Sequence, residues 1–226
     1  TIDAPVISPT AINTCLNTPI SGDLASLVSE GFPPYTFALV NVSSGANATV
    51  SLTGIYNFVP STGYSGPAGF IYSATDTNDC VNTGTVSVTV DSLAAGNGNL
   101  QTCNNSASGI LIDYVNGGIG ALVFTGPLSS TCGTVTISPN GAFVYNAPIG
   151  FTGPCTFVYG VSDLIDCSST GAITIVANTA PVVVDALIIP CANQSYSDTL
   201  ARLVQGNPQQ PLTFAIVTQP TNGTLS

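Results

Sequence analysis

Three cysteines recur at a constant interval along this sequence. Cys15, Cys103 and Cys191 lie 88 residues apart, twice in succession. Each is followed by a polar stretch and then by an apolar segment that we interpret as a strand. These segments are Leu24–Val28, Ile110–Val115 and Leu200–Val204. A fixed period of this length indicates a tandem array in which each repeat is one structural unit.

Further positions of the first two copies match at an offset of 87 residues. The matched pairs are Tyr56 and Phe143, Phe58 and Tyr145, Phe70 and Phe157, Tyr72 and Tyr159, Asp76 and Asp163, Asp79 and Asp166, and Cys80 and Cys167. The segment Gly63–Pro67 likewise corresponds to Gly150–Pro154. We therefore expect two full repeats, at residues 1–91 and 92–178, followed at residues 179–226 by the N-terminal half of a third.

Within each repeat, apolar side chains alternate with polar ones in short segments. The alternating sets are Cys155, Phe157, Tyr159 and Val161; Phe143 and Tyr145; Val86, Val88 and Val90; and Ile173 and Ile175. This period of two is typical of strands with one buried face, so these side chains are predicted to form the core. Turn residues recur every 8–12 positions, as in a sandwich of about seven strands, and Asn140-Gly141 predicts a tight hairpin turn.

The composition restricts the classes of partner. Apolar residues make up 44% of the chain, an ordinary globular level, but charged residues make up only 5% and the net charge is −10. Nothing here could neutralise phosphates or an anionic membrane surface, so nucleic acid and membrane partners are excluded. No apolar run reaches the roughly 18–20 residues that span a bilayer. The polar surface must be built mainly from Thr, Ser, Asn and Gln, which offers little charge repulsion against self-association.

The run from Gly133 to Asp163 resembles the bacterial cadherin-like or Ig-like tandem repeat, in which a G-T-V, G-x-F-x-Y-x-P, G-F-x-G-x-D-x-F-x-Y-x-V-x-D pattern occupies the middle strands. The resemblance covers both full repeats and reaches Gly223-Thr224-Leu225. It implies an all-β protein of cadherin-like sandwiches arranged end to end, as in secreted adhesins and surface stalks. The acidic residue that usually follows G-F-x-G is missing, since Ala68 and Cys155 stand near its place, so its role is not carried over.

Seven cysteines with repeat-locked spacing, in a chain without His, indicate disulfides and an oxidising, extracellular compartment. In an Ig-like sandwich the first strand begins at the end that holds the turn between the last two strands. We therefore expect bonds within repeats, Cys15 to Cys80 and Cys103 to Cys167. The alternative crosses the boundaries and joins Cys80 to Cys103 and Cys167 to Cys191.

Two further cysteines, Cys132 and Cys155, have no cysteine counterpart in the first repeat and predict a bond with each other. Cys191 is then unpaired in these residues, because its partner would fall about 64 residues later. We expect the chain to stop in mid-domain.

The sequence lacks most of the side chains that enzymes use for catalysis. Without His and Lys, the Ser–His and Ser–Lys nucleophile arrangements cannot form, and we expect no enzyme. The repeated aspartates Asp76, Asp79, Asp163 and Asp166 lie in a predicted turn, where Asp caps backbone N–H groups. The alternative is calcium, which cadherin-like domains hold at their junctions and which would add Asp3 and Asp91 as ligands. No other cofactor is expected.

The functional hypothesis is a structural extracellular repeat protein that forms a surface stalk, fibre or filament. Its partners would be copies of itself or further repeats of the same chain. One alternative is an adhesin module that recognises a glycan or a host protein. Another is a donor-strand-exchanged filament subunit whose half repeat is completed by a neighbouring chain. Five Asn-x-Ser/Thr sequons are candidates for glycosylation, at Asn41, Asn47, Asn104, Asn193 and Asn222.

Overall fold

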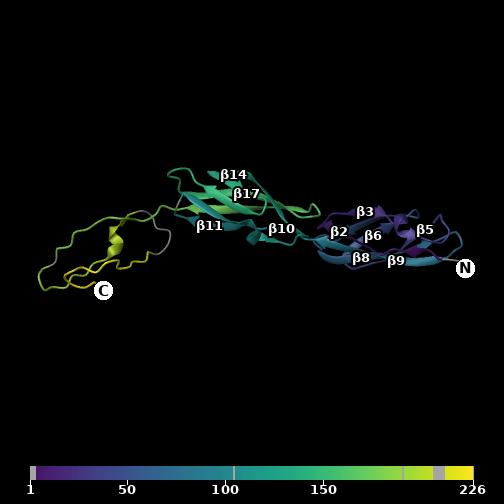
Figure 1. The fold of residues 1–226 in the computed structure, drawn as a ribbon, viewed down its shortest axis with the longest axis horizontal. Coiled ribbons are helices and arrows are strands. Elements are labelled where there is room, and N and C mark those ends of the chain that lie inside the picture. Colours follow the sequence, from purple (N-terminus) through teal and green to yellow (C-terminus); the bar gives the residue numbers. More distant parts are fainter. Residues whose placement is uncertain (1–3, 104, 190, 206–211, 226) are drawn as a thin grey trace.

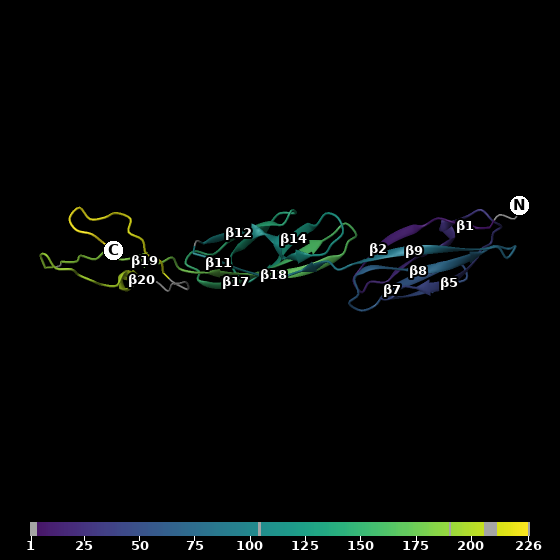
Figure 2. The same ribbon diagram turned by 90° about the horizontal axis from the view of Figure 1, so that it is seen from below.

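The computed structural model describes residues 4–103, 105–189, 191–205 and 212–225 of the chain. The protein is all-β, and its repeats follow one another end to end along the long axis (Figures 1 and 2). The first repeat lies at the N-terminal end, the second occupies the middle, and the beginning of the third lies at the C-terminal end. The predicted all-β tandem architecture is confirmed.

Seven strands of the first repeat form two sheets. One sheet has the order β2-β9-β8-β5 and the other the order β3-β7-β6. The bounds are β2 (Thr10–Cys15), β3 (Ile20–Asp23), β5 (Thr36–Val42), β6 (Ala46–Val50), β7 (Ile55–Pro60), β8 (Gly66–Thr75) and β9 (Val81–Asp91). A separate two-stranded sheet joins β1 (Val6–Ile7) to β4 (Val28–Ser29).

The second repeat has the same plan. Its sheets have the orders β11-β18-β17-β14 and β12-β16-β15, and β10 pairs with β13. The bounds are β10 (Ala94–Ala95), β11 (Gly98–Thr102), β12 (Ser106–Ile110), β13 (Val115–Asn116), β14 (Val123–Ser130), β15 (Thr134–Ile137), β16 (Ala142–Asn146), β17 (Gly153–Ser162) and β18 (Ser168–Ala177). The predicted turn at Asn140-Gly141 lies in the β15–β16 hairpin.

One strand pair in each repeat is parallel. β2 runs parallel to β9, and β11 runs parallel to β18, whereas the other strand pairs of the described residues are antiparallel. The first long strand therefore ends beside the end of the last strand. This pairing decides at which end of a domain each cysteine lies.

The alternating side chains meet between the two sheets, as expected. Phe58, Phe70, Tyr72 and Val86 of the first repeat are buried, and so are Tyr145, Phe157, Tyr159 and Ile173 of the second. The tilted ring pairs are also equivalent: Tyr56 with Phe70 and Phe143 with Phe157 both have centroids 5.2 Å apart. Each repeat therefore buries its own core.

The apolar segments after the first cysteines are not plain strands, which corrects the expectation. They contain single 3₁₀ turns, η1 (Ala25–Leu27), η2 (Leu111–Tyr114) and η3 (Leu200–Leu203), each followed by a two-residue strand. The apolar residues in these segments do not alternate. In the first two repeats the segment instead places one leucine, Leu24 or Leu111, fully inside the core.

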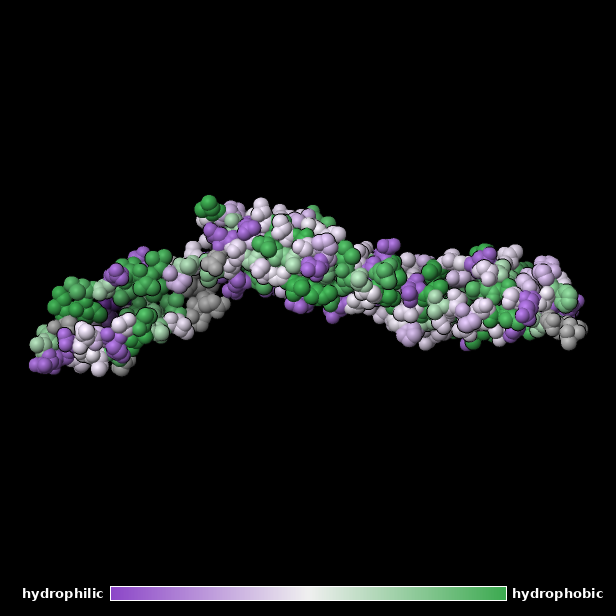
Figure 3. Space-filling view, viewed as in Figure 1, coloured by the Kyte–Doolittle hydropathy of each residue, from purple (hydrophilic) through white to green (hydrophobic). Residues whose placement is uncertain are grey.

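The described part of residues 179–225 forms only η3 and the pair β19 (Val182–Val183) and β20 (Val204–Gln205). None of its described residues is buried. Figure 3 shows hydrophobic side chains gathered on this part of the surface; Leu187, Ile189 and Val217 are each more than 80% exposed. This segment has the opening elements of a repeat but no core of its own.

Candidate functional site at the junction of the repeats

A disulfide joins the first repeat to the second. It connects Cys15 to Cys167, with the Cα atoms 5.5 Å apart and 152 residues between them in sequence. Cys15 is the last residue of β2, and Cys167 precedes β18 in the β17–β18 hairpin. In the chain-entropy description, closing a loop of this size stabilises the folded pair by about 5 kcal/mol.

This bond corrects the pairing expected within repeats. In the register of the parallel pair, Cys15 lies opposite Asp91 at the far end of β9, whereas Cys80 lies just before β9 begins. The two cysteines are therefore at opposite ends of the repeat. At about 3.3 Å per residue, a strand of this length separates them by far more than a disulfide spans. The error lay in placing Cys15 at the start of its strand rather than at its end.

The other expected bonds have a mixed outcome. Cys132 and Cys155 are bonded to each other, with Cα atoms 5.6 Å apart. The alternative bonds across sequence-adjacent boundaries, Cys80 to Cys103 and Cys167 to Cys191, are not formed. Cys80, Cys103 and Cys191 are free thiols.

Asp91 ties the end of the first repeat to the second. Its side chain is 7% exposed. One carboxylate oxygen accepts the N–H of Leu93 at 3.0 Å, and the other accepts the N–H of Gly118 at 3.0 Å. The neighbouring Gly117 has a φ of +76°, and a Cβ there would lie 2.6 Å from the carbonyl oxygen of Ser92. The loop after β13 can approach the linker this closely because it carries glycine.

Asp163 fixes the hairpin that carries Cys167. One of its carboxylate oxygens accepts the N–H groups of Ile165 and Cys167 at 3.0 and 2.9 Å, and the other accepts the N–H of Ile119 at 2.9 Å. Asp166 completes the turn in the left-handed conformation, with a φ of +62°. The predicted capping of backbone N–H groups is thus made by Asp163, whereas Asp166 supplies the left-handed residue of the turn.

The first repeat builds the same hairpin around Asp76. The N–H groups of Asn78, Cys80 and Phe32 donate to its carboxylate. Asp79 has a φ of +60°, matching Asp166. Burial by itself would raise the pKa of Asp76, but these three N–H groups outweigh it and hold that pKa below its ordinary value.

Oxygen atoms of Asp91 and Asp163 and the sulfur of Cys167 lie within 4.8 Å of one another. The two carboxylates together accept five backbone N–H groups, two on Asp91 and three on Asp163. These donors compensate two buried negative charges in a chain with a single cationic side chain, Arg202. The arrangement aligns the two repeats and supports the disulfide between them.

The donor set does not fit calcium. Ca²⁺ takes six to eight oxygen ligands, and the junction offers two carboxylates that are already engaged by N–H groups, beside a sulfur held in a disulfide. Asp76 and Asp79 lie a repeat length away, at the other end of the first repeat, and Asp3 lies outside the described residues. Calcium binding at these aspartates stays an untested alternative from the sequence, and the contacts at the junction argue against it.

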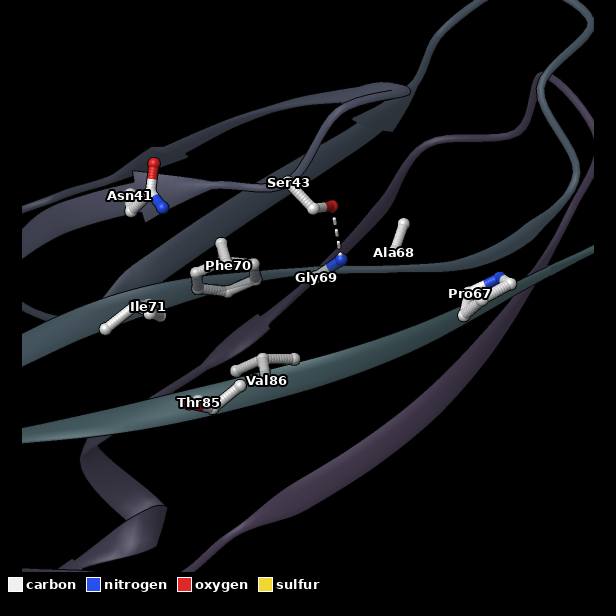
Figure 4. A pocket seen from close by; sticks show the side chains of 9 residues that line it. All are labelled: Asn41, Ser43, Pro67, Ala68, Gly69, Phe70, Ile71, Thr85 and Val86. Atoms are coloured by element: carbon white, nitrogen blue, oxygen red, sulfur yellow. Dashed lines mark hydrogen bonds between the residues drawn. The ribbon is translucent and has the colours of Figure 1, made fainter.

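A shallow depression lies on the first repeat beside β5 and β8 (Figure 4). Ser43 borders it and accepts the N–H of Gly69 at 2.9 Å, and Asn41 lies at its edge. Thr85 adds a third polar side chain, and the rest of the lining is apolar or glycine and includes no titratable side chain. This surface offers no group for acid–base or nucleophilic chemistry.

The sequons lie at exposed positions where the structure describes them. Asn41 and Asn47 are on β5 and β6, and Asn193 and Asn222 are in the C-terminal segment. Asn104 lies outside the described residues. Glycosylation stays a prediction, which the intact mass of native material would test.

The repeat geometry agrees with a sequence family. The sequence model described as "Bacterial Ig domain" matches residues 2–89 and again residues 97–176. The chain belongs to the bacterial Ig domain family. No curated protein matches it in sequence. No helix among the described residues is long and apolar enough to cross a membrane.

Solved structures with a similar fold include cadherins. Domains 3–6 of protocadherin Gamma B2 match at 14% identity and a TM-score of 0.34, over 78% of this chain and 53% of that one. Drosophila N-cadherin EC1-4 matches at 12% and 0.34, over 78% and 50%. A SusE-like surface located polysaccharide binding protein from Bacteroides thetaiotaomicron matches at 10% and 0.32, over 77% and 34%. This bacterial Ig chain thus spans about half of each cadherin structure and about one third of the polysaccharide binding protein. Similarities at this level say nothing about its ligands.

Asp163→Asn should destabilise the second bacterial Ig repeat. An amide keeps one acceptor oxygen but not the charge, so at least one buried N–H loses its partner, at a cost of about 2 kcal/mol. Urea unfolding of the oxidised chain measures the change. Asp113→Asn is the matched control, because Asp113 is exposed on η2. Equal effects of the two substitutions would contradict the role given to Asp163.

The lowered pKa of Asp76 should make the first repeat acid-sensitive. Because the pKa of Asp76 is lower in the folded state than in the unfolded state, its ionised carboxylate adds to the free energy of unfolding. This contribution is fully present above the unfolded pKa of about 3.9 and is lost as the pH falls through the folded pKa. Asp76→Asn should therefore have a lower urea midpoint than wild type at pH 7, and the two should converge by about pH 2. Asp79→Asn is the control, since its carboxylate accepts none of the three N–H groups. A constant difference at all pH values would contradict this account.

Removing divalent cations should not change stability. We expect the same melting temperature in EDTA and in millimolar Ca²⁺, because the junction carboxylates are already satisfied by N–H groups. A rise in melting temperature with Ca²⁺ that Asp91→Asn abolishes would instead establish the calcium site.

Proposed function

We propose that this chain is part of an extracellular stalk or fibre whose bacterial Ig domains are covalently joined end to end and transmit tension. The observation that carries the proposal is the Cys15–Cys167 bond. A protein that only displayed binding loops would have little need for a covalent bond between successive domains. A stalk needs its junctions to hold.

The position of the bond shortens the covalent path of a pulling force. A force applied at the N-terminal end of the first repeat follows β1 and β2 to Cys15 and crosses the disulfide to Cys167. It then leaves along β18, which begins at the next residue. Residues 16–166 lie outside this path. Neither core has to resist the force for the chain to keep its length.

The junction also resists bending. Asp91 accepts the N–H of Gly118 across the boundary, and within the first repeat the N–H of Leu16 donates to the carbonyl oxygen of Asp91 at 2.7 Å, which ties the residue after Cys15 to the end of β9. β10 contacts β18 as well as pairing with β13, so the linker is built into the second repeat. A chain held by both a disulfide and these contacts behaves as a rod rather than as beads on a flexible thread.

The surface and the compartment suit a fibre. The family and two disulfides fit an oxidising, extracellular location. With 5% charged residues, the surface opposes side-by-side association of stalks only weakly.

The C-terminal segment favours one variant of this proposal. Its exposed leucines, isoleucines and valines need further strands to cover them, from later residues of a longer protein or from a neighbouring chain as in strand exchange. Either source continues the array. The adhesin alternative stays a prediction. The depression beside Ser43 gives it little support, because it presents few polar groups to a glycan.

Pulling single oxidised chains should therefore not extend either full repeat. Cys15→Ser/Cys167→Ser should restore an unfolding step with a contour-length gain of roughly 250–300 Å for the first repeat. The step for the second should be shorter by roughly 80 Å, because the Cys132–Cys155 bond still closes its loop. Free thiols are alkylated beforehand so that no other bond forms.

Cys132→Ser/Cys155→Ser is the matched control. It also removes one disulfide, but one that lies wholly inside the bypassed region, so the oxidised variant should still show no step. Full-length unfolding steps in the oxidised wild type would contradict the proposed tension path.

A further inference from the structure

The two cysteines of the junction disulfide occupy positions in the fold that other, free cysteines of the chain also occupy. The disulfide joins the cysteine that ends the first long strand of one repeat to the cysteine of the last hairpin of the next repeat. Each repeat contains one cysteine of each kind. The first repeat contributes Cys15 and the second contributes Cys167 to the observed bond, which leaves Cys80 and Cys103.

Cys103 has the same setting as Cys15. It directly follows β11, which runs parallel to β18 as β2 does to β9. The residue before it, Thr102, donates its hydroxyl to the carbonyl oxygen of Ser106 at 2.7 Å, just as Thr14 donates to that of Thr18 at 2.7 Å. The Cys103 thiol is exposed at the C-terminal end of the second repeat.

Cys80 has the same setting as Cys167. Its N–H donates to Asp76 at 3.0 Å, and its carbonyl oxygen accepts the N–H of Asp76 at 3.0 Å. The corresponding distances between Cys167 and Asp163 are 2.9 and 3.0 Å. The two differ in exposure: Cys167 is buried at the junction, whereas Cys80 is half-exposed at the N-terminal end of the first repeat.

Cys80 and Cys103 cannot bond to each other within one chain. Cys80 precedes β9 at the N-terminal end of the first repeat and Cys103 follows β11 at the C-terminal end of the second, whereas a disulfide requires Cα atoms within about 7 Å. Each needs a partner on a domain that docks end to end with its own repeat.

We propose that Cys80 and Cys103 are each one half of an interdomain disulfide of the Cys15–Cys167 kind, formed with the adjoining bacterial Ig repeat on either side. The partner of Cys103 is the last-hairpin cysteine of a following repeat. The partner of Cys80 is the first-strand cysteine of a preceding repeat. The adjoining repeats belong either to the same protein or to second copies of this chain. The inference rests on the end-to-end array of the proposed function.

Each bond forms by oxidation of two thiols. They lose two protons and two electrons as the S–S bond forms, and a disulfide oxidant, either glutathione disulfide or an oxidoreductase, takes these up and becomes two thiols. Desolvation raises the pKa of the Cys80 thiol, and the carboxylates of Asp76 and Asp79 raise it further. One of the two thiols attacks the oxidant and the other attacks the resulting mixed disulfide, so the raised pKa of Cys80 slows whichever step its thiolate carries out.

A disulfide map of native material that contains this chain tests the proposal. Free thiols are alkylated, the material is digested without reduction, and linked peptides are identified by mass spectrometry. We expect Cys103 linked to a cysteine four residues after a turn aspartate, and Cys80 linked to a cysteine that ends a first strand. Partner peptides outside these 226 residues assign the bonds to further repeats. A link from Cys80 to Cys103 or to Cys191, the first-strand cysteine of the third repeat, assigns the bond to a second copy.

The recombinant chain in a glutathione redox buffer provides the second arm. If second copies are the partners, cross-linked ladders form and are lost in Cys80→Ser and in whichever first-strand variant, Cys103→Ser or Cys191→Ser, removes its partner. Cys132→Ser/Cys155→Ser is the matched control, because that bond lies inside the second repeat and its loss should leave the ladder unchanged.

Two results would overturn the proposal. One is recovery of Cys80 and Cys103 from native material as alkylated thiols or glutathione adducts. The other is a link between two first-strand cysteines, such as Cys103 to Cys191, or ladders that Cys80→Ser leaves intact. In either case the Cys15–Cys167 tension path would be unaffected, so pulling experiments would still judge the stalk proposal on its own.

Discussion

The parallel pairing of β2 with β9 determines how the rest of this protein is connected. Because the first long strand runs alongside the last one and in the same direction, its final residue lies at the exit of the domain. A cysteine there faces the next repeat rather than its own hairpin. Had the pairing been antiparallel, the same residue would lie beside Cys80, and each domain would be closed on itself.

The junction also shows how a chain almost without cations can bury carboxylates. Asp91 and Asp163 receive backbone N–H groups instead of Lys or Arg side chains. Such donors are fixed by the turns that present them, so the same carboxylates that need compensation also hold the loops in place. The compensation needs no flexible cationic side chain.

The repeat period, the strands and the core could be predicted from the sequence because each depends on local patterns. Tyr145, Phe157 and Ile173 alternate in short segments, and alternation reports burial directly. The disulfide partners could not be predicted in the same way. Cys15 and Cys167 are brought together by strand direction and by the stacking of two domains. Neither strand direction nor domain stacking produces a pattern in the residues near these cysteines. The repeat offset could not decide between the pairings either. Cys15 and Cys80 have counterparts in the second repeat whether the bond lies within a repeat or joins one repeat to the next.

The 3₁₀ turns could not be predicted from the sequence, whereas the capping aspartates could in part. The apolar segments were expected to be strands, but a run without alternation does not distinguish a strand from a single helical turn. For Asp163 the residue type in a turn was enough, since a short carboxylate there has few other uses. Its partnership with Asp91 depended on how two domains dock, which lies beyond local pattern.

The long loop closed by Cys15 and Cys167 also changes what a protease can achieve. A single cut at any peptide bond between these residues, including the linker between the domains, leaves both pieces in one covalent molecule. Separating them takes a second cut outside the loop or a reductant. If each junction of a longer array carried the same bond, successive loops would overlap, and a protease in the surroundings could nick the fibre without releasing what is attached to its tip.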